Sequence, residues 1–189
     1  KCLVKLSPGG GDAVEMREFN SKSLTFVKNG FTLPTAKMNV SWMDENQLFV
    51  GTDFGAGSMT KSGYSRIQKI WQRGTALSEA KTVLKADSKS VYAYAHRFFG
   101  DKENIDLLVE AVTYWRNSYS QYIEGKVVPL KLPQSAVIDD AIDGQLVVSL
   151  KEDWTFNGKS YSQGSVLLIE PSLLRGEQGE ITQLIGADN

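Results

Sequence analysis

The sequence predicts an all-β fold, and three observations lead to this class. Short runs rich in β-branched and aromatic residues recur along the whole chain of 189 residues, and such runs are typical of strands. Glycine, asparagine and aspartate cluster between the runs, as they do in turns. The runs do not alternate with long helical patterns, which would have indicated a parallel sheet built from βαβ units.

Fourteen runs are expected to form strands. In chain order they cover residues 3–6, 13–19, 24–27, 40–43, 47–52, 66–71, 81–85, 90–99, 105–115, 119–123, 126–132, 144–150, 165–170 and 181–185. Turn signals lie between them at 9–12, 29–30, 44–46, 100–101 and 143–144, and Asn157-Gly158 stands between two aromatic arms, which predicts a hairpin with a type I′ turn. Short, closely connected and mostly antiparallel strands fit a sandwich, a barrel or the blades of a propeller.

Two segments have a helix as their alternative. Residues 75–86 place Leu77, Ala80 and Leu84 at helical spacing, and residues 101–115 begin with acidic residues and continue with an apolar face. Strands are favoured in both, because the neighbouring sequence alternates or carries β-branched residues.

The four tryptophans suggest a loose repeat. Trp42, Trp71, Trp115 and Trp154 are separated by 29, 44 and 39 residues, which straddles the roughly 40 to 50 residues of a propeller blade. Each tryptophan taken alone is more simply explained as a large core residue.

Composition narrows the classes of partner. With 21 basic and 22 acidic side chains, the formal net charge of −1 gives no general attraction to nucleic acid or to an anionic membrane. No apolar run has the length of a membrane span, and the first residues lack the apolar core of a signal peptide. Cys2 is the single cysteine, which excludes an internal disulfide framework and leaves both a periplasmic and a cytoplasmic location open.

The segment from Gly55 to Ser62, GAGSMTKS, differs at one position from the phosphate-binding pattern G-x-x-x-x-G-K-[ST]. Thr60 occupies the place of the second glycine, and its branched side chain hinders the close backbone approach that glycine allows. The sequence that follows is turn-like and too weakly periodic for the helix that a phosphate loop needs. A glycine-rich loop between two strands is therefore expected, with an anion site as the less favoured alternative.

The inventory of reactive side chains predicts no catalytic residue. His96 is the single histidine, and strand alternation places it on one face with Tyr92, Tyr94 and Phe98, as expected for a packed or half-exposed strand residue. Ser58 is not in a G-x-S-x-G elbow, and Cys2 lies at the extreme of the chain.

No metal or cofactor site is predicted either. One histidine and one cysteine do not make a zinc site without many carboxylates. Asp139, Asp140 and Asp143 have the wrong spacing for a calcium loop, and a solvated turn is expected there. Asn39-Val40-Ser41 fits the N-glycosylation pattern, a triplet that is common by chance.

The stretch VGTDFGAGSMTKSGYSRIQKIWQRGTALSEAKTV, residues 50–83, resembles the propeller domain of prolyl oligopeptidase-family serine peptidases, in particular their bacterial prolyl-oligopeptidase-like branch. The segments 6–37 and 144–170 are similar to blade segments before and after it, so the resemblance covers nearly the whole chain. One departure is Ser65, which stands where the family has a proline after S-G-Y.

The resemblance implies that residues 1–189 are a single all-β propeller fragment of about four blades, an open arc without the catalytic α/β-hydrolase domain. The fragment would then be no enzyme, although its parent would be a serine peptidase of short peptides, and the propeller would gate access to the hydrolase domain that follows it. Open edges would favour self-association through strands. An independent all-β binding or scaffold module is the alternative.

Overall fold

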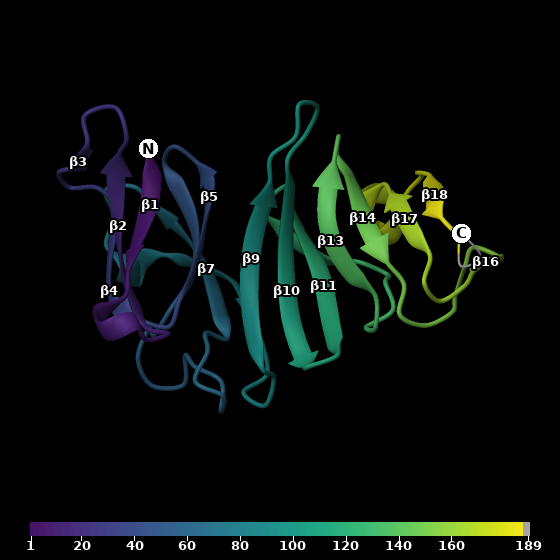
Figure 1. The fold of residues 1–189 in the computed structure, drawn as a ribbon, viewed down its shortest axis with the longest axis horizontal. Coiled ribbons are helices and arrows are strands. Elements are labelled where there is room, and N and C mark those ends of the chain that lie inside the picture. The colour runs from purple at the N-terminus through teal and green to yellow at the C-terminus, as the bar shows by residue number, and fades with distance from the viewer. Residues whose placement is uncertain (187–189) are drawn as a thin grey trace. The chain divides into compact units, whose positions relative to one another are not determined.

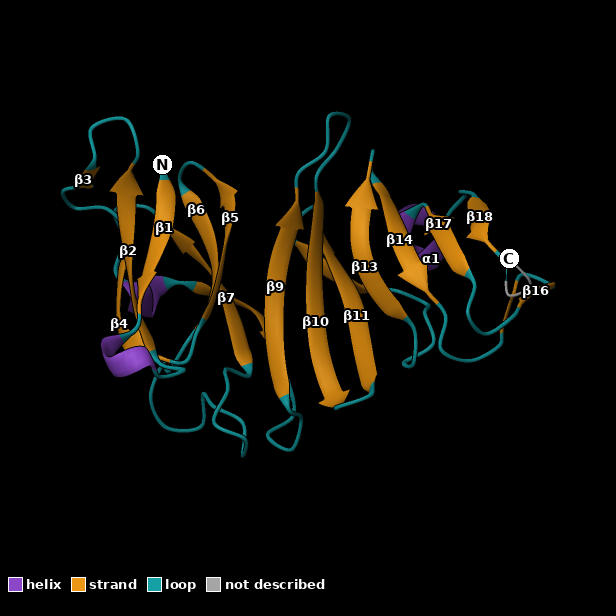
Figure 2. Ribbon diagram, in the orientation of Figure 1, coloured by secondary structure: helices purple, strands orange, loops and turns teal. Residues whose placement is uncertain are grey.

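The structure is a computed structural model that describes residues 1–186, and it is built almost entirely of strands (Figures 1 and 2). The chain divides into two compact units, Lys1–Ala95 and His96–Asn189, with the division inside strand β9 (Tyr92–Phe98). In the described residues no helix is long and apolar enough to cross a membrane.

Two antiparallel sheets make up the first unit. In the first sheet, β2 is the central strand and pairs with the other three; its strands are β1 (Cys2–Leu6), β2 (Val14–Asn20), β3 (Thr25–Phe26) and β4 (Thr32–Ala36). The second sheet is a simple meander of β5 (Asn39–Asp44), β6 (Gln47–Gly51), β7 (Ile67–Gln72) and β8 (Lys81–Lys85). Short 3-10 turns cover Pro8–Gly10 and Leu77–Glu79.

Two further sheets follow. One is the meander of β9, β10 (Ile105–Thr113), β11 (Arg116–Ile123) and β12 (Lys126–Pro129). The other contains β13 (Val137–Ile142), β14 (Gln145–Ser149), β17 (Val166–Ile169) and β18 (Ile181–Ile185). A separate hairpin of β15 (Trp154–Phe156) and β16 (Lys159–Tyr161) is inserted before β17, and the helix α1 (Pro171–Arg175) precedes β18.

The four sheets, each of four strands in near-sequential order, have the organisation of propeller blades, which confirms the predicted all-β class. Buried residues explain why the central strands form. Met16 and Glu18 of β2 are buried while Arg17 between them is exposed, and in β10 the run from Ile105 to Val109 is buried throughout. A core cluster of the first unit joins both of its sheets and consists of Met16, Phe31, Leu33, Leu48, Val50, Trp71 and Ala80.

The expected turns are also present. Asn157 and Gly158 have φ of 48° and 78°, the positive values that a type I′ turn requires at both central positions, so the predicted hairpin is confirmed. The helical alternatives are wrong: residues 81–85 and 105–113 are strands, and only Leu77–Glu79 forms a 3-10 turn.

Three elements were not expected from the sequence. The strand β4 contains Pro34, which lowers the strand signal but is tolerated at an edge. Asp139 and Asp140 lie in β13 rather than in a turn, because the turn is formed by Asp143 and Gly144 alone. The helix α1 has proline at its first turn and Gly176 at its end, with φ of 94°.

The tryptophan repeat is wrong as a blade signature. Trp42 lies on the first strand of its sheet and Trp71 on the third, whereas Trp115 stands in the turn between β10 and β11 with 79% of its surface exposed. The spacing therefore reflects no common position in the blades.

Candidate functional site

The glycine-rich loop connects β6 to β7, as expected, and its backbone amides are already engaged. The N–H groups of Ser58 and Thr60 donate to the carbonyls of Gly55 (3.1 Å) and Tyr64 (2.8 Å), and that of Lys61 donates to Ser88 (3.0 Å). A phosphate loop needs free amides converging on one point at the start of a helix, and here a strand follows. The loop is therefore a structural connection.

Ser58 and Thr60 are anchors of this loop. The Ser58 hydroxyl donates to the Gly55 carbonyl at 2.7 Å and accepts from the Phe54 amide at 2.9 Å. The Thr60 hydroxyl donates to the Val91 carbonyl at 2.9 Å, which ties the loop to the segment that leads into β9. Cys2 is exposed, and its thiol lies 3.7 Å from the Phe19 carbonyl.

His96 lies on β9, where its ring contacts Phe98 edge-on with centroids 4.9 Å apart. Tyr92 and Tyr94 stack at 6.0 Å on the same strand, in line with the predicted alternation. Partial burial lowers the pKa of His96, and the negative charge of Asp140 opposes this effect. In residues 1–186, no three histidine, cysteine or acidic side chains gather closely enough to hold a metal ion.

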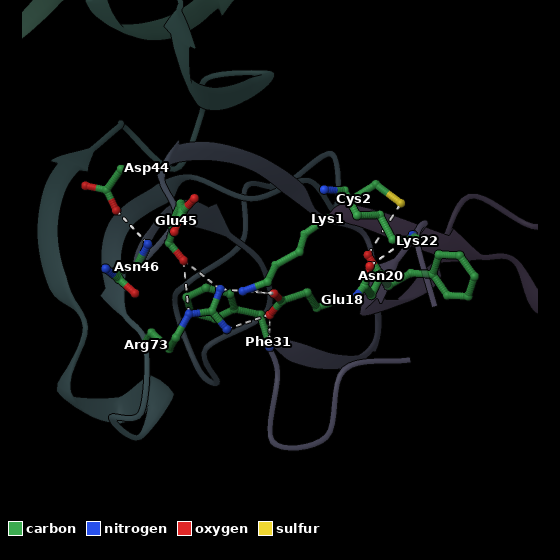
Figure 3. Close-up of polar contacts among 11 residues, drawn as sticks. Lys1, Cys2, Glu18, Asn20, Lys22, Phe31, Asp44, Glu45, Asn46 and Arg73 are labelled. Atoms are coloured by element: carbon green, nitrogen blue, oxygen red, sulfur yellow. Dashed lines mark hydrogen bonds and ion pairs between the residues drawn. The ribbon is translucent and has the colours of Figure 1, made fainter. Parts of the chain in front are cut away.

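A buried ion pair connects the two sheets of the first unit (Figure 3). Glu18 of β2 is 1% exposed, and Arg73, just after β7, donates to its two carboxylate oxygens at 2.7 and 3.0 Å. The Phe31 amide donates to the same carboxylate at 2.9 Å, and the guanidinium of Arg73 lies 4.4 Å from the centre of the Phe31 ring. Such bidentate pairing satisfies the buried charge on both sides.

These contacts set the ionisation of Glu18. Burial raises the pKa of this carboxyl, but the hydrogen bonds from Arg73 and Phe31 and the positive charges of Arg73 and Lys1 outweigh burial. The pKa therefore lies below its usual value of 4.5, and the group is charged at neutral pH. The cluster stabilises the fold and has no free group for chemistry.

A pocket of about 260 Å³ lies in the first unit, and we call it the tyrosine pocket. It is lined by Lys37, Met38, Asn39, Tyr64, Ser65, Tyr92, Ala93 and Tyr94. Sequence reasoning placed Tyr92 and Tyr94 on one face of a strand but missed the pocket, because Tyr64 and Asn39 reach it from a loop and from another strand.

Buried polar groups form the support beneath the tyrosine pocket. The carboxamide nitrogen of Gln68 donates to the Ala93 carbonyl at 2.8 Å and to the Ser65 hydroxyl at 3.3 Å. Gly51 makes this arrangement possible, since a β-carbon there would lie 2.0 Å from the Gln68 nitrogen. The lining of the site thus comes from the strands β5 and β9 and from two loops, and its support from β6 and β7.

A larger hollow of about 600 Å³ lies in the second unit. Its lining carries charges of both signs, among them Lys102, Glu103, Asp143 and Arg175. Arg175 is already paired with Glu177 at 2.9 Å and bonded to Gln121, so its guanidinium is engaged within the fold. This hollow has no aromatic residue in its lining.

Comparisons with known proteins find similarity to peptidases. It is 31% identical over 191 residues to an uncharacterized peptidase of Sinorhizobium fredii, and 22% identical over 192 residues to one of Rickettsia prowazekii. These alignments cover 97% and 94% of this chain, but only 26% and 27% of the relatives. The chain thus spans about a quarter of the length of the curated relatives that it matches. No family model matches it.

A solved structure agrees with these relatives. The structure of a post-proline cleaving enzyme from Rickettsia typhi superimposes with a TM-score of 0.88 over 97% of this chain and 29% of that enzyme, at 19% identity. At this identity the likeness shows the fold. In sequence the chain is therefore similar to a segment of two peptidases, and in fold to a segment of a post-proline cleaving enzyme. This fits the resemblance that the GTDFG motif and its neighbouring blade segments carry.

Proposed function

We propose that residues 1–189 are a non-catalytic propeller segment of a prolyl-oligopeptidase-like serine peptidase, and that the segment restricts access to the catalytic domain. The observation that carries the proposal is the match of nearly the whole chain to about a quarter of two peptidases. The chemistry is assigned to an α/β-hydrolase domain elsewhere in the parent protein, which would be this segment's main partner. The substrates would be short peptides, with cleavage after proline suggested by the name of the structural relative.

The physical basis of the gating role is exclusion by size. A ring of blades above an active site admits a flexible short peptide and excludes a folded protein, while it also keeps bulk water from the reaction. Four successive sheets supply rigid walls for such a ring, because each sheet is held by a continuous antiparallel ladder. No catalytic residue is assigned to the segment itself.

The first experiment tests whether this segment is non-catalytic. The 189-residue chain is treated with a fluorophosphonate probe that labels activated serines, and is then assayed with a proline-containing chromogenic peptide. We expect neither labelling nor hydrolysis. Labelling at Ser58 or at any other serine of the chain would overturn the proposal, since it would show an activated nucleophile inside the propeller.

The second experiment tests gating in the full parent protein. Hydrolysis rates are compared for a short prolyl peptide and for an unfolded protein that contains the same cleavage sequence. We expect the full protein to prefer the short peptide strongly, and a protein lacking residues 1–189 to lose that preference. If the ratio of the two rates stays the same after removal, the segment does not gate.

A binding or scaffold module is the second candidate, and the tyrosine pocket is the observation that favours it.

Self-association through strand edges is compatible with both candidate functions. We propose β18 as the edge involved, because Leu184 and Ile185 are about half exposed there. Lysines at both ends of β8 would keep that edge unpaired. Sedimentation of the 189-residue chain as a monomer at high concentration would contradict association through β18.

A further inference from the structure

The tyrosine pocket has the composition of a site for a positively charged group. Its walls include the rings of Tyr64, Tyr92 and Tyr94; Tyr64 and Tyr92 meet edge-on with centroids 6.4 Å apart. Tyr64 and Tyr92 are 40% and 38% exposed, so both rings present part of their surface to the outside. Aromatic faces carry partial negative charge and attract ammonium groups.

The chain itself already uses this property. The ammonium of Lys37 lies 4.3 Å from the centre of the Tyr64 ring, which is within the range of a cation–π interaction. Lys37 is held only loosely otherwise, by an ion pair with Asp12 at 3.5 Å in which the Asp12 side chain is 74% exposed. Because Asp12 is mostly exposed and Lys37 is only half-buried, with 32% of its side chain exposed, this pair contributes little and allows Lys37 to move aside.

One lining residue of the pocket carries a buried acceptor without a donor. The side-chain oxygen of Asn39 is buried and accepts no hydrogen bond from any group in residues 1–186. Leaving a buried acceptor unpaired is costly, and turning the carboxamide toward a donor in the pocket would forfeit no hydrogen bond of that oxygen. The Ser65 hydroxyl, which belongs to the same lining and accepts a hydrogen bond from Gln68, supplies a second polar group.

We propose that the tyrosine pocket binds the primary ammonium group of a small ligand, and that this group replaces Lys37 on the Tyr64 ring. An ammonium has three donors and no acceptor, which suits an unpaired amide oxygen beneath aromatic walls. The volume of about 260 Å³ limits the ligand to one or two amino acid residues. That the ligand is the amino terminus of a peptide rests on the proposed peptidase function, whereas the ammonium chemistry rests on the pocket alone.

The test is a titration of the isotopically labelled 189-residue chain, followed by amide NMR signals. The probes are butylammonium, trialanine with a free amino terminus, the same peptide acetylated, and acetyl-lysine amide. We expect butylammonium and free trialanine to shift the signals of the Asn39 side chain, Ser65 and Ala93. Acetylated trialanine should leave these signals unchanged. Lysine amide acetylated on its α-amino group keeps the side-chain ammonium, so it distinguishes a lysine side chain from an amino terminus as the source of the ammonium.

Lys37→Gln gives a test whose sign depends on the mechanism. If Lys37 is the internal competitor, its removal strengthens binding of the ammonium probes by about three- to thirtyfold, the range of a cation–π contact. If the pocket instead takes an anion through Lys37, acetate binds to the natural chain and the variant loses it, which would overturn the proposal. Lys22→Gln removes the same charge from an exposed site outside the pocket and should change nothing.

The remaining outcomes are equally decisive. Equal binding of free and acetylated trialanine would overturn the proposal, because the ammonium would not be needed. The absence of any shift with every probe in the Lys37→Gln chain, whose other signals show an intact fold, would also overturn it. Binding of butylammonium without binding of either peptide would keep the ammonium pocket and count against a peptide ligand, and so against the proposed function rather than the site.

Discussion

Two arginine–carboxylate pairs, one in each unit, use the same chemistry for different purposes. In the first unit Arg73 and Glu18 are 55 residues apart and connect two sheets, whereas in the second Arg97 and Asp106 lie on neighbouring strands of one sheet. Both pairs are bidentate, with distances of 2.7 and 3.0 Å in the first and 2.6 Å for both bonds in the second.

The two pairs are buried to a similar extent and differ in what brings their residues together. The Glu18 side chain is fully buried, and Arg73 is 23% exposed, while Asp106 and Arg97 are 8% and 17% exposed. The neighbours of Asp106 are fixed by the sheet in any case, but Glu18 and Arg73 meet only when two sheets pack. The first pair therefore depends on the packing of two sheets against each other, whereas the second depends only on the pairing of β9 with β10 within one sheet.

The largest effect is expected from Arg73→Met. This change leaves the buried Glu18 carboxylate with the Phe31 amide and with only the half-exposed Lys1, at 3.8 Å, as counter-charge, and the free energy of unfolding of the first unit should fall by about 3–5 kcal/mol. Urea unfolding followed by tryptophan fluorescence measures this loss of stability. Trp42 and Trp71 lie in the first unit, and variants that keep a single tryptophan separate the signals of the two units.

The matched control is the double change Glu18→Gln with Arg73→Met. It removes both charges, so the loss should be smaller than for Arg73→Met alone, because no uncompensated charge remains. A loss in Arg73→Met below about 1 kcal/mol would show that water reaches Glu18 and that the pair does not hold the sheets together.

Asp106→Asn should cost less, about 1–2 kcal/mol, in the second unit. The amide keeps the shape of the carboxylate and one acceptor for Arg97, and both residues stay on paired strands of one sheet. Urea unfolding with Trp154 as the remaining tryptophan provides the measurement. A loss equal to that of Arg73→Met would abolish the distinction between a pair inside a sheet and a pair between sheets.

The pH dependence sharpens the comparison further. Because the folded pKa of Glu18 lies below 4.5, its contribution to stability is complete above that pH and is lost as the pH falls through the folded value. His96 also has a lowered pKa, so protonation opposes folding, and its contribution is lost as the pH falls below 6.5 toward the folded value.

The second unit is therefore expected to weaken slightly in mild acid, and the first at lower pH. Urea midpoints between pH 7 and pH 3 test this order, with His96→Gln and Glu18→Gln as the variants in which the respective pH dependence should diminish. An unchanged slope in Glu18→Gln would assign the acid sensitivity to other carboxylates.

Much of this fold could be predicted from the sequence because most strands carry their own signal. The alternation in β2 and the Asn157-Gly158 turn are local properties, so spacing alone reveals them. The strand β13 could not be recognised in the same way, since Asp139 and Asp140 are typical turn residues; Asp140 pairs with Val147 of β14, and Asp139 lies at a bulge beside it.

The sites were far less predictable from the sequence, because their residues are far apart along the chain and local patterns do not reveal them. Nothing in the sequence near Glu18 points to Arg73, and Asn39, Tyr64 and Tyr92 are distant in sequence until the sheets assemble the tyrosine pocket. Local patterns identify elements, whereas a site depends on contacts between elements. The position of the glycine-rich loop between two strands could be predicted, because that prediction depended only on Thr60 and on the weak periodicity of the sequence that follows.

The smallest effect is expected at the turn between β10 and β11, where Tyr114 and Trp115 are 80% and 79% exposed and contact each other edge-on at 4.8 Å. Replacing both by serine removes one surface aromatic contact, so the free energy of unfolding should change by no more than about 1 kcal/mol. Urea unfolding at several protein concentrations measures it. A larger loss that grows with concentration would show that these rings pack against a second copy, which would make this turn, rather than β18, the surface through which the chain associates.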